Sequence, residues 1–195
     1  MHLSRRVRHH HRSGVIEGRS SRFYDFQARW LLRRVYRRLA ADIAAVAPPG
    51  ADVLDLGTGP GVLLVELGRV RPDLRLTGID LSADMITNAS RNLRRAGTRG
   101  SVQVGDVADL PFPDDSFDLA VSSLSLHHWE QPEVVASHLA RVLRPGGKVM
   151  IYDLPFAPFD QLTEAARDTG LSGPVVRTRV RTGIPFLRVD KLELG

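Results

Sequence analysis

Residues 53–61, which read VLDLGTGPG, constrain the fold of this chain more than any other segment. A short apolar run containing Asp55 leads into three glycines, Gly57, Gly59 and Gly61, after which apolar residues recur at helical spacing. Glycine lets the backbone turn tightly and approach a ligand, and a helix start offers free N–H groups to an anion. The segment therefore predicts a strand, a ligand-binding loop and a helix.

The spacing of the glycines separates two classes of cofactor. A dinucleotide fingerprint needs glycines at the first, third and sixth positions, and the sixth position from Gly57 is Val62. The carboxylate of Asp55 would be badly placed beside a pyrophosphate, whereas it suits a ligand with an ammonium group. The methionine part of S-adenosylmethionine carries such a group. The loop thus favours S-adenosylmethionine as cofactor, with S-adenosylhomocysteine as product, over the NAD of a Rossmann oxidoreductase.

Acidic residues also follow the next two predicted strands. Asp80 lies 25 positions after Asp55, where a carboxylate accepts hydrogen bonds from both ribose hydroxyls. Asp106 either accepts the adenine amino group or is a solvated loop acid. Met85, near the start of a helix, either lies on the adenine face or belongs to the core.

Short apolar runs alternate with helical segments along most of the chain. Strands are predicted at 51–56, 75–80, 101–105, 117–123 and 148–153, and helices at 28–46, 60–70, 82–96, 132–143 and 159–168. We expect Ser82 to cap one of these helices. Such alternation predicts a Rossmann-like, doubly wound α/β fold with a mostly parallel sheet.

The C-terminal segment has a different pattern. Two strand candidates, 175–181 and 184–192, are separated only by Thr182 and Gly183, which predicts an antiparallel hairpin with a two-residue turn. This hairpin would complete a seven-stranded sheet. The expected organisation is a basic arm at 1–20, a helical cap at 21–47 and the Rossmann-like core at 48–195.

Positive charge is concentrated near the N-terminus. Residues 1–38 hold eleven arginines against Glu17 and Asp25, a net charge of +9, so the remaining residues carry −4 of the total of +5. Clustered arginine binds phosphates or an anionic membrane without sequence specificity. The simpler interpretation of residues 1–20 is a solvated, partly disordered tail.

Composition excludes several classes of protein. The chain has no cysteine, so it has no disulfide framework and no thiolate metal site. It has no apolar run long enough to span a membrane and no signal-peptide core. A soluble, cytoplasmic enzyme is the expected class.

The residues around these motifs resemble the class I methyltransferases related to the enzymes of ubiquinone and menaquinone biosynthesis (methyltransferase type 11). The matching segments are residues 53–61, TGIDLSADM at 77–85, GDVADLPFPDDSFDLAVSSLSLHHW at 105–129 and RVLRPGGKVMIYD at 141–153. The resemblance implies that the methionine part contacts Asp55, Gly57 and Gly59, the ribose contacts Asp80, and adenine contacts Asp106 and Val107. It also implies that Tyr24 comes down over the donor from the N-terminal helical region.

The methyl acceptor is expected near the carboxyl ends of the fourth and fifth strands, where open α/β sheets bind ligands. Transfer from a sulfonium depends largely on positioning, so no metal is expected. His127, the first histidine after the fourth strand, is predicted to act as a base, and Asp153 to orient the acceptor. The alternative for His127 is a ring packed on the crossover and hydrogen-bonded to backbone.

The expected partner is a small molecule methylated at an O, N or activated C atom. Residues 122–126 read SSLSL and lack the Asn/Asp-Pro-Pro-aromatic motif of base methylation, so nucleic acid is not the expected partner. An RNA-directed enzyme that uses the arm, and a regulatory or scaffold protein that binds S-adenosylmethionine without catalysis, remain alternatives. Because the predicted hairpin turn leaves no room for an insertion, we expect a shallow pocket roofed by residues 22–46 or by a second subunit in a homodimer.

Overall fold

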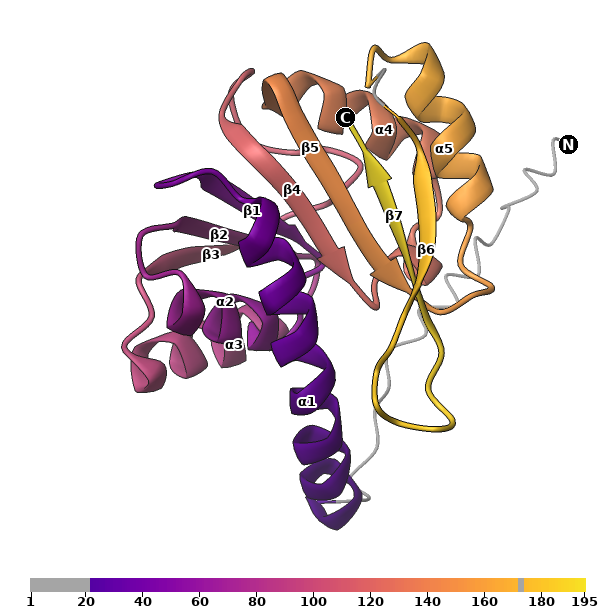
Figure 1. The fold of residues 1–195 in the computed structure, drawn as a ribbon. Coiled ribbons are helices and arrows are strands. Elements are labelled where there is room, and N and C mark those ends of the chain that lie inside the picture. The colour runs from indigo at the N-terminus through magenta and orange to yellow at the C-terminus, as the bar shows by residue number, and fades with distance from the viewer. Residues whose placement is uncertain (1–21, 172–173) are drawn as a thin grey trace, which may run out of the picture.

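The computed structural model describes residues 22–171 and 174–195, and the basic arm predicted at 1–20 lies outside them (Figure 1). Seven strands form one sheet in the order β3-β2-β1-β4-β5-β7-β6. Their bounds are β1 Asp52–Leu56, β2 Arg75–Asp80, β3 Gly100–Val104, β4 Phe117–Ser123, β5 Leu143–Asp153, β6 Val176–Val180 and β7 Val189–Leu194. Strands β1 to β5 are parallel, and β7 pairs antiparallel with both β5 and β6. The predicted fold class is confirmed.

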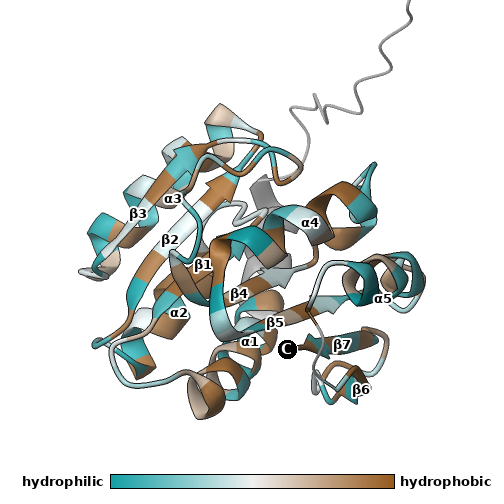
Figure 2. Cartoon of the chain, turned by 90° about the horizontal axis from the view of Figure 1, so that it is seen from above, coloured by the Kyte–Doolittle hydropathy of each residue, from teal (hydrophilic) through white to brown (hydrophobic). Residues whose placement is uncertain are grey.

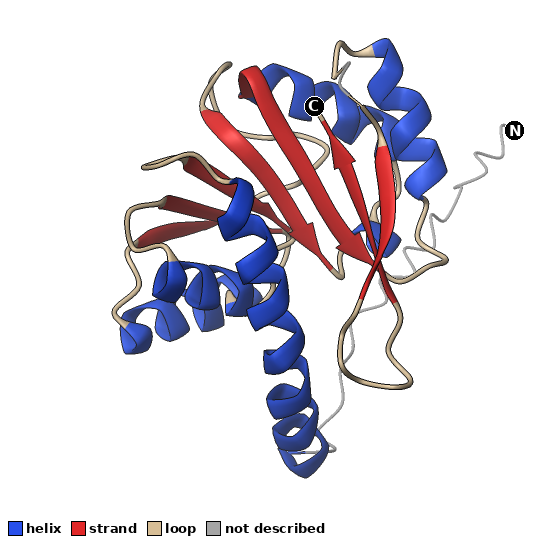
Figure 3. Ribbon diagram, in the orientation of Figure 1, coloured by secondary structure: helices blue, strands red, loops and turns tan. Residues whose placement is uncertain are grey.

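Helices cover both faces of the sheet (Figure 3). They are α1 Arg22–Val46, α2 Val62–Val70, α3 Ala83–Ala96, α4 Pro132–Val142 and α5 Phe159–Asp168, with a 3₁₀ turn, η1, at Leu126–His128. One core cluster joins α1, α2 and α3 to the sheet, and the other joins α4 and α5 to its opposite face. Figure 2 shows these layers from above.

The central strands are buried on both faces, as parallel strands covered by two helical layers must be. Leu54 and Ile151 belong to the cluster under α4 and α5, whereas Val53 and Met150 belong to the cluster under α1 and α2. This alternation follows from the two-residue side-chain period of a strand. It explains why these segments read as continuous apolar runs.

Local sequence signals set most element boundaries. The Ser82 hydroxyl accepts a hydrogen bond from the Met85 N–H at 3.4 Å, as predicted for the cap of α3, and Gly97 ends that helix in a left-handed conformation. The main difference lies in β5, which begins at Leu143 and not at Lys148. Residues 143–147 continue from the end of α4 directly into the sheet.

The predicted two-residue turn at Thr182 and Gly183 is wrong. The strands end at Val180 and resume at Val189, and residues 181–188 form a loop. The buried Thr182 hydroxyl donates to the Leu187 carbonyl at 2.8 Å and accepts from the Ile184 N–H at 3.1 Å. Ile184 and Leu187 pack on the core cluster under α1. Their apolar character, which suggested a strand, therefore anchors a loop.

This loop projects past the carboxyl edge of the sheet, as does the N-terminal half of α1 (Figure 1). The expectation that the hairpin leaves no room for additional structure over the acceptor side is consequently wrong as well. The C-terminal half of α1 is fixed in the core by Val35, Leu39 and Ile43, all at most 1% exposed.

Candidate functional site

The order of the strands places a crevice at the carboxyl end of β1. Strand β1 has β2 on one side and β4 on the other, so the chain leaves these strands toward opposite faces of the sheet. Open α/β sheets bind ligands at such a switch point. A pocket of ≈ 440 Å³ lies here, and its lining includes Gly57, Asp80, Asp106, Val107, Ser125 and Trp129. We call it the crevice pocket.

Asp55 lies on β1, two residues before Gly57 of the crevice pocket, and the protein satisfies only one of its two carboxylate oxygens. Its side chain is fully buried, and Oδ2 accepts a hydrogen bond from Thr58 Oγ1 at 2.7 Å. Oδ1 is buried without a hydrogen-bond partner among the described residues. Burial, opposed by the Thr58 hydrogen bond and assisted by the charge of Asp80, raises the pKa of Asp55 to about 7. A cationic donor group would satisfy this oxygen and favour the carboxylate.

The glycine loop is shaped by positive φ angles and by one close contact. Gly57 has a φ of +65°, and a Cβ built there would lie 1.9 Å from the Ser125 hydroxyl oxygen. Gly59 has a φ of +53°, and a Cβ built there would meet nothing within 4 Å. The backbone at Gly57 therefore lies close to the segment that follows β4, and the backbone at Gly59 faces open space. A loop that binds a ligand through its backbone needs such space.

Asp80 is tied to the glycine loop. Its Oδ2 accepts the Gly59 N–H at 2.8 Å, and its Oδ1 accepts the Ser82 N–H at 2.9 Å. A carboxylate oxygen accepts more than one hydrogen bond, so both oxygens retain capacity for a diol. The Asp106 carboxylate accepts the Ala108 N–H at 2.9 Å.

The structure does not bring every predicted cofactor residue to the crevice pocket. Met85 is 41% exposed on α3 and does not line it. Tyr24 lies in the first turn of α1, and its side chain is outside the described part of the chain. Their contacts with the donor stay predictions, as do the roles of Asp55, Gly57, Gly59, Asp80, Asp106 and Val107 (all six lie in or beside the crevice).

His127 and Asp153, predicted separately from two strand ends, form a hydrogen-bonded pair. His127 Nδ1 lies 2.7 Å from Asp153 Oδ1, and the His127 backbone N–H donates to Oδ2 at 3.1 Å. The Asp153 side chain is fully buried, whereas that of His127 is 20% exposed. A carboxylate at Nδ1 makes that nitrogen the donor and leaves Nε2 as an acceptor.

Tyr36 on α1 was missed by the sequence reasoning. Its hydroxyl interacts with the Ser123 side chain at the end of β4. Burial, together with the charges of Asp55 and Asp153, raises the pKa of Tyr36 to about 12. The phenol is therefore protonated at neutral pH and close enough to both carboxylates to sense their charges. Its position in the predicted helix 28–46 gave no signal that would separate it from the other residues of that helix.

The segment after β4 contributes further side chains to the site. Leu124 adopts a φ of +54°, which is uncommon for a non-glycine residue and recurs at functional sites. Trp129 Nε1 donates to Ser125 Oγ at 3.0 Å, and this fixes the hydroxyl that confines Gly57. The His128 ring, whose centroid lies 4.0 Å from that of His127, lines the crevice pocket.

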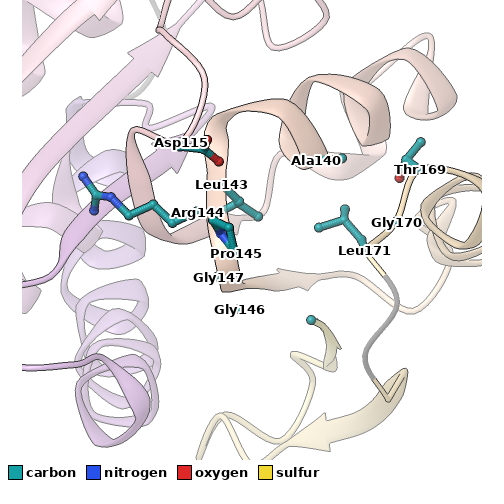
Figure 4. A pocket seen from close by; sticks show the side chains of 11 residues that line it. Asp115, Ala140, Leu143, Arg144, Pro145, Gly146, Gly147, Thr169, Gly170 and Leu171 are labelled. Atoms are coloured by element: carbon teal, nitrogen blue, oxygen red, sulfur yellow. The ribbon is translucent and has the colours of Figure 1, made fainter.

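A second pocket, of ≈ 270 Å³, lies at the opposite edge of the sheet around the start of β5 (Figure 4). Its one cationic side chain, Arg144, points away and pairs with Asp52 and Asp118 at 2.9 and 2.8 Å. Asp115 is the other charged side chain in the lining, and the pocket is remote from Asp55 and His127.

Two further findings bear on the class of protein. No three histidine or acidic side chains of the described residues converge as a metal site would require. Within residues 22–171 and 174–195, none of the helices combines the length and apolar character needed to cross a bilayer.

The switch-point crevice, the glycine loop and the Asp55–Asp80 arrangement define a Rossmann-like protein with a site for an adenosyl cofactor. The Methyltransferase domain family matches residues 54–151. The chain belongs to this family, and S-adenosylmethionine is the methyl donor that membership implies.

Individual relatives agree with this assignment. The chain is 30% identical over 152 residues to demethylmenaquinone methyltransferase from Thermus thermophilus, covering 78% of this chain and 64% of that protein. It is 30% identical over 188 residues to O-methyltransferase resE from Aspergillus sclerotiorum, covering 83% and 70%. A SAM dependent methyltransferase from Aquifex aeolicus shares the fold, with a TM-score of 0.66, 20% identity and coverage of 84% and 90%. The chain spans between 47% and 64% of the length of three curated relatives.

The residues of the crevice fit this donor. The unpartnered Asp55 oxygen suits the ammonium group, the open space at Gly59 suits the methionine part, and Asp80 keeps acceptor capacity for a ribose diol. Asp106 lines the same pocket as Gly57 and Asp80.

Proposed function

We propose that the protein is an S-adenosylmethionine-dependent methyltransferase that acts on a small molecule with an acidic hydroxyl, a phenol or an enol. The methyl group would go to that oxygen or to the carbon that it activates. The observation that carries the proposal is the His127–Asp153 pair, with a Nδ1–Oδ1 distance of 2.7 Å, beside a crevice suited to the donor. The two relatives reported above, a demethylmenaquinone methyltransferase and an O-methyltransferase, support this acceptor class.

The donor side of the site binds and orients the cofactor. When bound, S-adenosylmethionine supplies an activated methyl group on a sulfonium. Asp55 would hold the ammonium group, Asp80 the ribose hydroxyls and Asp106 the adenine amino group. Binding at Asp55 requires its carboxylate form, because a protonated carboxyl offers no charge to a cation.

The acceptor side removes a proton. Asp153 fixes the His127 ring with Nδ1 protonated, so that Nε2 accepts the acceptor's hydroxyl proton and the resulting imidazolium is stabilised by the buried carboxylate. General-base catalysis of this kind contributes about 10²–10⁴-fold. Tyr36, which stays protonated, serves as a hydrogen-bond donor near the oxyanion.

A transfer assay tests this proposal. Labelled S-adenosylmethionine is incubated with phenolic and enolic acceptors, with wild-type protein, with His127→Gln, and with His138→Gln on α4 as the matched control. Calorimetric titration with S-adenosylhomocysteine, with NADH in parallel, measures the donor site separately.

We expect S-adenosylhomocysteine to bind all three proteins alike and NADH to bind none. Transfer should fall by about 10²-fold or more in His127→Gln and stay unchanged in His138→Gln. Equal transfer by His127→Gln would reject the base. Donor binding with no transfer to any acceptor would favour the scaffold alternative.

A further inference from the structure

Two neighbouring loops carry the most exposed large hydrophobic side chains of the described residues. Phe186, in the 181–188 loop, is 96% exposed, and Phe156, in the loop after β5, is 75% exposed. Asp153 pairs with Asp190 and Val180 with Val189. Both loops therefore leave adjacent strands at the carboxyl edge of the sheet, as Figure 1 also shows.

The exposure of Phe186 is built into the loop. Thr182 closes the loop through its hydrogen bonds to residues 184 and 187, and Ile184 and Leu187 pack inward on the core cluster. Phe186 is left pointing outward from an anchored segment. A single exposed apolar residue is common at protein surfaces, so the charges beside Phe186 decide what this loop can bind.

Three arginines lie on or against the 181–188 loop that carries Phe186. Arg181 and Arg188 are exposed at the two ends of the loop. Arg38 of α1 hydrogen-bonds the Arg181 carbonyl and lies against Gly183. Unlike Arg177 and Arg179, which pair with Asp190, none of the three forms an ion pair with another described residue. We call Arg38, Phe156, Arg181, Phe186 and Arg188 the basic–aromatic rim.

We propose that the basic–aromatic rim docks on an anionic lipid surface. An aromatic side chain that enters the interfacial region, with arginines at the level of the headgroups, is the combination that such a surface binds. The rim is formed by projecting loops and has a net positive charge, so it is complementary to a flat anionic layer.

The rim continues to the acceptor side of the molecule. The ring centroid of Phe156 lies 6.0 Å from that of His127. Docking would therefore place the predicted base at the lipid boundary, within reach of an acceptor dissolved in it. This last link rests on the proposed function, whereas docking itself is measured without methyl transfer.

Vesicle sedimentation tests the proposal with the full chain. The vesicles contain phosphatidylcholine alone or phosphatidylcholine with phosphatidylglycerol, at low and high salt. The rim variants are Phe186→Ser and the double variant Arg181→Gln/Arg188→Gln. The matched controls lie at the opposite edge: Val70→Ser, which is also an exposed apolar residue, and Arg94→Gln/Arg95→Gln in the last turn of α3.

We expect binding only to the phosphatidylglycerol vesicles. The double arginine variant should weaken it by about five-fold for each arginine at low salt, and Phe186→Ser by about ten-fold at both salt concentrations. The control variants should bind as the wild type does.

Three results would overturn the proposal. The first is absence of binding to the anionic vesicles. The second is salt-sensitive binding that no rim variant alters, which would assign it to the arginine-rich residues 1–20. The third is displacement from vesicles by single-stranded RNA whose own binding depends on Phe186, which would make the rim a nucleic-acid surface.

Discussion

Gly57 occupies a position that no other residue fits, for two separate reasons. Its φ is +65°, and a Cβ there would lie 1.9 Å from Ser125 Oγ. Gly97 has nearly the same φ, +66°, but a Cβ there would meet nothing within 4 Å. Comparing substitutions at Gly57 and Gly97 therefore separates the cost of backbone strain from the cost of steric crowding.

We therefore predict that Gly97→Ala costs about 1 kcal/mol of unfolding free energy through strain alone. Gly57→Ala should cost about 1–3 kcal/mol more, and it should weaken S-adenosylhomocysteine binding by at least ten-fold because the loop must shift. Denaturant unfolding and calorimetric titration measure both. Equal effects of the two variants would mean that Ser125 moves aside freely.

Asp55 makes both folding and donor binding depend on pH. Its folded pKa is about 7, against 3.8 for an ordinary Asp. Between these values the unfolded chain loses the proton and the folded protein keeps it. The contribution of Asp55 to stability therefore falls as pH rises through this window and is constant above about pH 7.

Donor binding should follow the opposite trend, because the ammonium group needs the carboxylate. We predict that affinity for S-adenosylhomocysteine rises as pH increases from 6 to 8, and that Asp55→Asn binds weakly without this rise. The same variant should be more stable than the wild type at pH 8 in thermal unfolding. A wild-type affinity that is flat across this range would show that Asp55 does not face the ammonium group.

At the scale of elements, α1 is held to α2 by one buried carboxylate. Glu66 on α2 has a side chain only 6% exposed and pairs with Arg33 of α1 at 2.8 Å, Arg37 of α1 at 3.5 Å and Arg69 at 2.6 Å. The arginines are 41–60% exposed, so solvent screens their side of the network. The same helix carries Tyr36 to the site, which links this network to function.

We predict that Glu66→Gln destabilises the protein by about 1 kcal/mol, since it removes ion pairs to three arginines that are largely exposed and regain water in the variant. Amide exchange along α1 should become faster at the same time. Glu164→Gln, at an exposed position of α5, is the control and should change the midpoint of denaturant unfolding by less than about 0.5 kcal/mol equivalent. If global stability fell but amide exchange in α1 changed no more than in the other helices, Glu66 would not be what fixes α1 on α2.

At the scale of the whole molecule, the sequence predicts the centre of the sheet well, because burial on two faces makes each central strand a continuous apolar run. The apolar segments around Leu54, Val121 and Ile151 are recognisable as strands from their local sequence alone. The sequence predicts a strand at 184–192 because Ile184 and Leu187 are apolar. Only tertiary packing shows that these two residues anchor a loop. The Tyr36–Ser123 contact joins residues 87 positions apart, and no local pattern encodes it.

The two pockets lie at opposite edges of the sheet, and only one edge has the charges that a donor needs. S-adenosylhomocysteine at about 100 times its Kd should stabilise the fold by about 2.7 kcal/mol and raise Tm by about 5–10 °C. Hydrogen exchange should then slow at residues 55–61, 80–82 and 105–108 beyond the global change. The pocket around Arg144 and Gly146 serves as the internal control. If exchange slowed around that pocket and not in the glycine loop, the donor would bind at the start of β5, and the site derived from Asp55 and Asp80 would be rejected.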